Sequence, residues 1–224
     1  MAEPPRAPLL FLHGLGVGPA GWRPQLDDLG RDRRTAAPRL PLELERAVAA
    51  VDEEVERIGD LPIDLCGLSF GGLVALRHAA SNPVGVRRMV VAAAFARIPA
   101  HLRALQSAVT AAALVVPERV LKRRLAADVP ERYREDLADV RRTEIIRLMG
   151  EASRVDLRDA TRSIGARTLV LCGERDRINL PLCRELAALL PHGQFAVVPD
   201  AGHVANLDNA DAFSRLIRAF LDEA

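Results

Sequence analysis

The chain has 224 residues, of which 49% are hydrophobic and 27% are charged, and its formal net charge is +1. These values are typical of a globular chain that buries one sizeable core, and they exclude the disordered and fibrous classes. Because the net charge is close to zero, the overall positive field that drives binding to nucleic acid or to anionic lipid is lacking, and we expect neither as a partner.

The N-terminal residues and the cysteines indicate a cellular location. The stretch MAEPPRAP has an acidic residue and three prolines, and it does not resemble a secretory signal peptide. No apolar run approaches the roughly 20 residues of a membrane helix. Cys66, Cys172 and Cys183 contain no C-x-x-C pair, which argues against a disulfide framework and a zinc site. The sequence therefore predicts a cytoplasmic protein without a bound metal.

Short apolar runs alternate with segments of helical periodicity along the chain. The runs predicted as buried strands are 9–12, 34–37, 63–66, 88–93, 168–172 and 194–198. The segments predicted as helices are 20–30, 43–58, 70–81, 180–190 and 208–222. This order predicts an α/β fold, with a mostly parallel sheet of about six strands and helices on both faces.

One interval, 97–165, contains no clear strand. Within it, Tyr133, Leu137 and Val140 fall on one helical face of the stretch ERYREDLADVRRTEIIRLM. Pro117 and Pro130 are expected to separate its helices. We therefore expect a helical insertion at 97–165, folded onto a sheet domain formed by 1–96 and 166–224.

The stretch DLCGLSFGG, residues 64–72, places a serine between a predicted strand and a predicted helix. In a G-x-S-x-G turn of this kind the serine has a strained backbone and its hydroxyl projects clear of the sheet. Gly67 and Gly71 allow strand and helix to approach closely, while the helix directs its free N–H groups toward Ser69. Ser69 is thus a candidate nucleophile, and the alternative is a glycine-rich turn with an incidental serine.

A serine hydroxyl needs a base and a group that orients the base. His203 lies in a glycine-containing loop between the last predicted strand and the last predicted helix, and Asp176 lies in the loop after the preceding strand. The order Ser69, Asp176, His203 is the one expected of an α/β-hydrolase. Glu174 and Asp200 are competing acids close to these loops.

Four blocks of the sequence together resemble the α/β-hydrolase fold family, in particular its esterases, enol-lactonases and C–C hydrolases. The blocks are LLFLHGLG at 9–16, DLCGLSFGG at 64–72, TLVLCGERD at 168–176 and DAGHVANLDNADAF at 200–213. The resemblance implies that His203 is the general base, that Asp176 orients it and that Ser69 forms an acyl-enzyme. It also implies an oxyanion hole formed by the backbone N–H groups of Leu15 and Phe70.

The family pattern also ranks the remaining polar residues. It favours Asp176 over Glu174 and Asp200, and it leaves Asp200 as a supporting residue. His13 is expected to stabilise the oxyanion loop. Haloalkane dehalogenases and epoxide hydrolases of this family have an aspartate at the position of Ser69. We therefore do not expect this chain to catalyse their reactions.

The sequence departs from the family pattern at two places. The two antiparallel strands that usually precede the His-Gly motif have no counterpart in it, so we expect a trimmed sheet. The usual D-x-P-G-x-G loop is replaced after RRTAAPRLP by a direct entry into a helix. One wall of the usual substrate pocket is therefore expected to be open or to be built from other residues.

The resulting hypothesis is a serine hydrolase of a small carboxylic ester or lactone that needs no cofactor. The insertion would act as a cap, and its apolar residues would shape the substrate pocket; they are Leu102, Leu105, Leu114 and Val115. Two alternatives remain open. The same three residues serve C–C bond hydrolysis of a diketone or dienone, and a hydrolase-like receptor would bind a ligand with little turnover.

Overall fold

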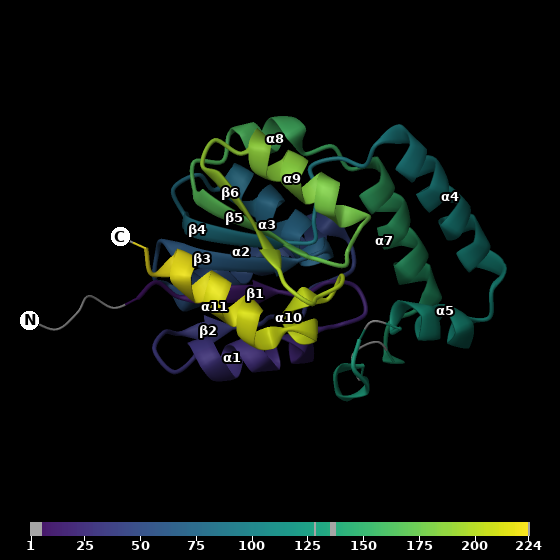
Figure 1. Cartoon of the computed structure of the whole chain (residues 1–224), viewed down its shortest axis with the longest axis horizontal. Coiled ribbons are helices and arrows are strands. Elements are labelled where there is room, and N and C mark those ends of the chain that lie inside the picture. The colour runs from purple at the N-terminus through teal and green to yellow at the C-terminus, as the bar shows by residue number, and fades with distance from the viewer. Residues whose placement is uncertain (1–5, 128, 135–137, 224) are drawn as a thin grey trace, which may run out of the picture.

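The fold is built on one parallel sheet, as the sequence predicts. The computed structural model describes residues 6–127, 129–134 and 138–223 (Figure 1). Its strands are β1 (Leu9–Leu12), β2 (Thr35–Ala36), β3 (Ile63–Leu68), β4 (Val86–Ala92), β5 (Arg167–Gly173) and β6 (Gly193–Val198). They pair in the order β2-β1-β3-β4-β5-β6, and every pair is parallel. All six predicted strands are confirmed, with ends shifted by a few residues at most.

Helices cover both faces of the sheet (Figure 1). One face carries η1 (Pro19–Trp22), α1 (Arg23–Leu29), α10 (Ala205–Asp208) and α11 (Ala210–Leu221). The other carries α2 (Leu44–Ile58), α3 (Phe70–Ser81), α8 (Arg158–Arg162) and α9 (Asn179–Leu189). The predicted helices 43–58, 70–81, 180–190 and 208–222 correspond to α2, α3, α9 and α11, whereas the predicted helix 20–30 divides into η1 and α1.

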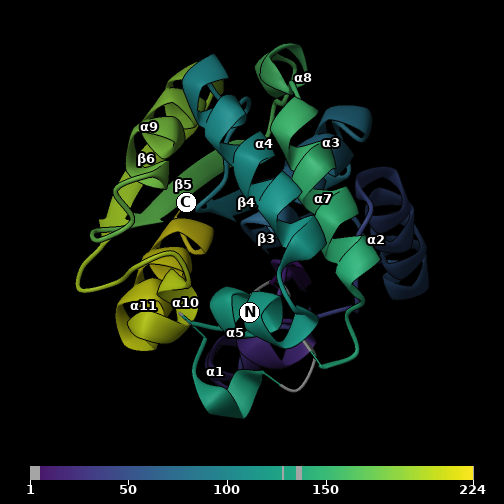
Figure 2. The same cartoon turned by 90° about the vertical axis from the view of Figure 1, so that its right-hand side faces the viewer.

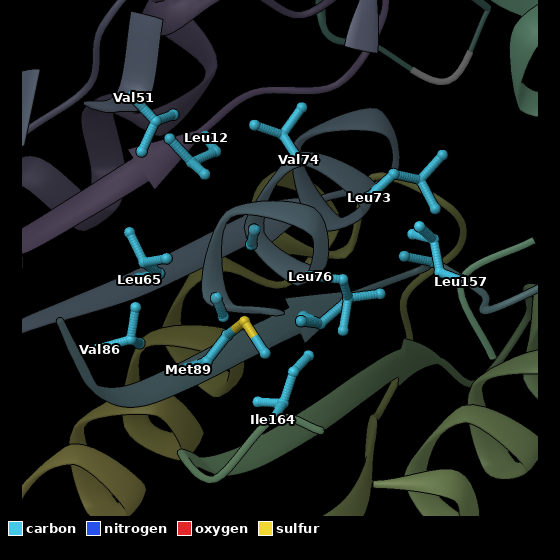
Figure 3. Packing of buried hydrophobic residues seen from close by; sticks show 14 of the residues in the cluster. Leu12, Val51, Leu65, Leu73, Val74, Leu76, Val86, Met89, Leu157 and Ile164 are labelled. Atoms are coloured by element: carbon cyan, nitrogen blue, oxygen red, sulfur yellow. The ribbon is translucent and has the colours of Figure 1, made fainter. Parts of the chain in front are cut away.

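The two cores follow from side-chain alternation along the strands. In β1, Leu10 and Leu12 enter the core beneath α2 and α3, whereas Leu9 and Phe11 enter the core beneath α1 and α11. Figure 3 shows the first of these cores, where Leu12 of the sheet and Val51 of α2 point toward each other. Each fully buried aliphatic side chain stabilises the fold by about 1.5–3 kcal/mol. The two cores therefore fix the strands from whose carboxyl ends the loops of the site begin.

The insertion forms a separate layer beyond the carboxyl ends of the strands (Figures 1 and 2). Its described elements are α4 (Ala100–Val115), α5 (Glu118–Leu125), η2 (Glu131–Tyr133) and α7 (Arg142–Arg154). Pro117 and Pro130 stand immediately before α5 and η2, where sequence analysis places the breaks. Since α4 and α7 pack side by side, the insertion has a small core of its own.

The structure describes the stretch 131–149 except for residues 135–137. Tyr133 belongs to a short 3-10 turn, Leu137 lies outside the described residues, and α7 begins only at Arg142. The Glu144 carboxylate accepts a hydrogen bond from the Arg141 N–H and so caps α7 at its first residue.

The segments that lead into and out of the insertion lie side by side at its base. Arg97 and Asp156 form an isolated antiparallel bridge, and the Leu157 N–H donates to the Ala96 carbonyl over 2.8 Å. Beyond this bridge α8 packs against α3 and α9 of the sheet layer. Among the described helices none combines the length and the hydrophobicity needed to cross a bilayer.

Candidate active site

Ser69 occupies a sharp turn between β3 and α3. Its backbone angles are φ 53° and ψ −114°, a combination that non-glycine residues rarely adopt. The turn is held because the Ser69 N–H donates to the Ala92 carbonyl over 2.7 Å and the Ser69 carbonyl accepts from the Gly72 N–H over 2.9 Å. A Cβ at Gly67 would overlap the Gly71 carbonyl, and one at Gly71 would overlap the Leu12 carbonyl. The G-x-S-x-G pattern thus has a steric basis in this fold.

The loop after β1 lies directly against this turn. A Cβ placed on Gly14 would be 3.3 Å from the Ser69 Cβ and 3.2 Å from the Leu68 carbonyl oxygen. Leu15, next in this loop, lines a cavity together with Ser69 and Phe70. Because α3 begins at Phe70, the N–H of that residue has no acceptor within the helix. The structure therefore brings Leu15 and Phe70, the two predicted oxyanion residues, to Ser69.

His203 and Asp176 complete a chain of hydrogen bonds that starts at Ser69. The Ser69 Oγ lies 3.1 Å from His203 Nε2, and His203 Nδ1 lies 2.8 Å from Asp176 Oδ2. Asp176 follows β5 and His203 follows β6, so parallel strands deliver all three side chains to the same edge of the sheet. The competing acids lie apart from the imidazole: Glu174 accepts a hydrogen bond from the backbone N–H of Asp200, and both side chains are exposed.

Asp176 is held ionised by its neighbours. Burial raises its pKa, but hydrogen bonding and charge from His203, together with hydrogen bonds from Asn179, outweigh burial and leave the pKa below its usual value. The Asn179 side-chain amide lies 3.0 Å from Oδ1 and 2.9 Å from Oδ2 of this carboxylate. The carboxylate can therefore accept a hydrogen bond from the His203 Nδ1–H group, which leaves Nε2 unprotonated and facing the serine hydroxyl.

His13 ties the loop after β1 to the loop after β2. The Leu40 N–H donates to His13 Nε2 over 2.9 Å, so this nitrogen is unprotonated. The proton then resides on Nδ1, which donates to the Gly14 carbonyl over 3.0 Å. A neutral, buried imidazole with both nitrogens engaged stabilises the loop that carries Leu15.

The family model for the alpha/beta hydrolase family matches residues 9–216. The chain belongs to the alpha/beta hydrolase family. This hydrolase is 27% identical over 254 residues to 2-hydroxymuconate semialdehyde hydrolase of Pseudomonas sp. strain CF600, with 97% of this chain and 87% of that protein covered. It is 28% identical over 201 residues to the pimeloyl-acyl-carrier-protein methyl ester esterase of Neisseria meningitidis serogroup A, with 81% and 63% covered.

Solved structures share the fold of this hydrolase. An esterase from Thermogutta terrifontis superposes with a TM-score of 0.80 at 23% identity, over 96% of this chain and 89% of that one. The enol-lactonase of Burkholderia xenovorans LB400 superposes with a TM-score of 0.75 at 22% identity, over 97% and 92%. The expected family and fold are thus confirmed, and the protein is an esterase-like hydrolase of this family.

The four apolar residues proposed from the sequence for the substrate pocket of the hydrolase lie elsewhere. Leu105, Leu114 and Val115 of α4 are 58%, 59% and 82% exposed, and Leu102 is half-buried. None of the four belongs to the lining of the two cavities that adjoin Ser69, where α4 contributes Gln106 instead. The helix is apolar around most of its circumference, so its periodicity could not show which face would turn inward.

Three polar residues at the site of the hydrolase were not proposed as site residues from the sequence. Asn179 contacts Asp176, Gln106 lines the smaller cavity beside Ser69, and Arg124 lines the larger one. A signal existed only for Asn179, because a residue three positions after an acid in a tight loop can return to it. Among the described residues no group of His, Cys, Asp and Glu side chains is arranged to hold a metal ion.

Proposed function

We propose that the protein hydrolyses a small carboxylic ester or lactone through an acyl-enzyme on Ser69. The observation that carries this proposal is the continuous hydrogen-bonded chain from Ser69 through His203 to Asp176, anchored at a strained strand-to-helix turn. A nucleophile, a base and an orienting carboxylate in hydrogen-bond contact form the arrangement that acyl transfer requires.

The reaction would proceed in two halves. The Ser69 oxygen attacks the carbonyl carbon while His203 Nε2 takes the hydroxyl proton, and the tetrahedral intermediate then expels the alcohol oxygen, which receives that proton from His203. Water next attacks the acyl-enzyme with His203 again as the base. The second intermediate releases the acid and returns the proton to the Ser69 oxygen.

The backbone N–H groups of Leu15 and Phe70 would stabilise the oxygen that becomes negative in both intermediates. The position of the two residues supports this role, because both line the cavity that also contains Ser69 in its lining. The amino end of α3 adds the positive end of its dipole at the same place. Removing one such donor from an oxyanion hole typically lowers kcat by about 10²–10³-fold.

The substrate class is supported by the relatives and by the position of the insertion. A curated relative is a methyl ester esterase, and two solved structures of the same fold are an esterase and an enol-lactonase. We propose that 97–165 is a cap over this site, since α4 and α7 contribute Gln106, Leu148, Met149 and Ala152 to the cavity beside Ser69.

Hydrolysis of a C–C bond is the second candidate. The observation that favours it is the match to 2-hydroxymuconate semialdehyde hydrolase along almost the whole chain. A vinylogous diketone distinguishes the two, because C–C hydrolysis consumes it whereas an esterase leaves it intact.

The test is a panel of 4-nitrophenyl esters from acetate to octanoate, measured with wild type and with Ser69→Ala. We expect turnover of at least the short esters by wild type and a loss of about 10⁴-fold or more in kcat for the variant. Unchanged turnover by purified Ser69→Ala would exclude Ser69 as the nucleophile. Tight binding of ligands without turnover of any ester or diketone would favour the receptor instead.

A further inference from the structure

Two cavities adjoin Ser69, and their linings share only Leu15 and Ser69. The smaller one, of about 140 Å³, is lined by apolar side chains and, besides Ser69, by one polar side chain, Gln106. The larger one, of about 260 Å³, is lined by His203 and by residues of α5 and the segment after it. The two cavities therefore offer chemically different surroundings to the two parts of a substrate.

The position of His203 assigns the cavities, on the basis of the function proposed above. The imidazole that takes the serine proton must give it to the leaving oxygen, so the leaving group has to lie within reach of His203 Nε2. His203 lines only the larger of the two cavities. The alcohol part of the ester therefore belongs in the larger cavity, and the acyl part belongs in the smaller, apolar one.

Arg124 is the permanently charged side chain in the lining of the larger cavity. It lies on α5, and its residue is exposed. Within the described parts of the chain its guanidinium forms no hydrogen bond or ion pair, whereas nearby Lys122 is engaged by Glu118 over 3.0 Å and by the Ala138 carbonyl over 2.7 Å. No described residue therefore occupies the side-chain donors of Arg124, and the guanidinium fork matches a carboxylate.

We infer that Arg124 selects esters whose alcohol part carries a carboxylate. One guanidinium balances one negative charge, and the acyl cavity contains no charged side chain, so the charge belongs on the leaving group. Arg123 provides a matched control, because it is the adjacent cation of the same helix and lines neither cavity.

The test compares three aryl esters on wild type, Arg124→Gln and Arg123→Gln. They are 4-acetoxybenzoate, with the charge on the leaving group, its neutral methyl ester, and monophenyl succinate, with the charge on the acyl group. We expect Arg124→Gln to lower kcat/KM for 4-acetoxybenzoate by about 5- to 10-fold, the size of a partly exposed ion pair. The neutral ester should change less than about 2-fold, and Arg123→Gln should leave the ratio of the two rates unchanged.

Two outcomes would overturn the inference. An equal loss on charged and neutral esters would mean that Arg124 only supports the cap. A selective loss on monophenyl succinate would place the charge on the acyl side and reverse the assignment of the cavities.

Binding of 4-hydroxybenzoate, the released product, separates this inference from the proposed function because it needs no turnover. We expect calorimetry to give a dissociation constant that rises about 5- to 10-fold in Arg124→Gln and is unchanged in Arg123→Gln. If no ester is turned over but this dependence holds, the proposed hydrolysis is wrong and the carboxylate site stands. If esters are turned over without dependence on Arg124 in either measurement, the hydrolysis stands and the carboxylate site is wrong.

Discussion

Asn179 is the residue that most directly supports the proposed base. Its amide contacts both oxygens of Asp176, and its amide nitrogen lies 3.2 Å from His203 Nδ1. A carboxylate fixed from one side by an amide has little freedom to turn away from the imidazole. Asn179 therefore acts through Asp176 and His203 as a positioning residue.

Asn179→Ala should lower kcat by about 10-fold with KM nearly unchanged, because this side chain lines neither cavity beside Ser69 and its loss loosens the His203–Asp176 geometry. Asn179→Asp should lower kcat further, since a second carboxylate beside Asp176 repels it and competes for the imidazole. Steady-state kinetics on a short 4-nitrophenyl ester measures both. Wild-type kcat in Asn179→Asp would contradict the positioning role.

The sequence predicts those single residues of the site that are marked by their neighbours along the chain. Ser69 could be predicted because Gly67 and Gly71 are close to it in sequence. In the structure a Cβ at either glycine would overlap a backbone carbonyl. The contacts of Asn179 depend on how the loop after β5 folds, and the cavity position of Arg124 depends on how the insertion packs. Neither arrangement is encoded by a short pattern.

Among the elements, the junction of β3 and α3 is the most tightly constrained. Gly71→Ala should destabilise the protein by about 1–3 kcal/mol or prevent folding, because the new methyl group would overlap the Leu12 carbonyl. Gly150→Ala in α7 is the control, since the nearest atom to its Cβ is a flexible Arg154 nitrogen at 3.9 Å. That change should stabilise the helix by about 1 kcal/mol. Urea unfolding of both variants tests the difference, and equal effects would contradict it.

A pH-sensitive contact joins α2 and α3. Asp52 Oδ1 lies 2.7 Å from His78 Nδ1, yet burial dominates and lowers the pKa of His78 below its usual value. Between the folded-state and unfolded-state pKa values the unfolded chain binds more protons, so stability falls as the pH is lowered through this window.

The free energy of unfolding of wild type should therefore decrease more between pH 7.5 and 5.5 than that of His78→Gln, in which this titration is absent. Urea unfolding at the two pH values measures the difference, and the other histidines contribute equally to both proteins. A larger decrease in His78→Gln would show that Asp52 dominates over burial.

Whether an element could be predicted depended on the sheet. The strands and the helices that pack on them have short apolar runs or clear periodicity, because one face of each is fixed by the core. The helices of the insertion do not pack on the sheet in this way. α4 is apolar on most sides and largely exposed, so the sequence predicts Leu105 and Val115 as pocket residues, although neither lines a cavity beside Ser69.

In the molecule as a whole, a group of buried ion pairs and the candidate catalytic residues lie at opposite ends of the strands. Asp64, near the start of β3, is fully buried and accepts hydrogen bonds from Arg33 over 3.3 Å and from Arg87 over 2.9 Å. Arg88 donates to the carbonyls of Phe220 and Leu221 at the end of α11. Asp64 precedes Ser69 by five residues along an extended strand, a separation of about 16 Å.

Asp64→Asn should lower the free energy of unfolding by about 1.5–3 kcal/mol, because it removes the charged acceptor of hydrogen bonds from the buried Arg33 and the partly exposed Arg87, whereas Arg33 keeps its contact with Asp222. Asp60→Asn is the control, because Asp60 is exposed and its contact with Arg34 spans 3.7 Å, so stability should hardly change. Ester turnover per folded molecule should be unaffected in both variants. Denaturant unfolding and active-site titration together measure this, and a loss of turnover in folded Asp64→Asn would contradict the separation.

The hydrogen-bonded chain at the carboxyl ends of the strands is proposed to activate Ser69. Intact-mass labelling of wild type, Ser69→Ala and His203→Gln with a fluorophosphonate probe measures this activation without any assumption about the substrate. We predict one adduct on wild type, none on Ser69→Ala and strongly slowed labelling of His203→Gln. Folded wild type that takes up no probe, or an adduct that persists on Ser69→Ala, would contradict the claim.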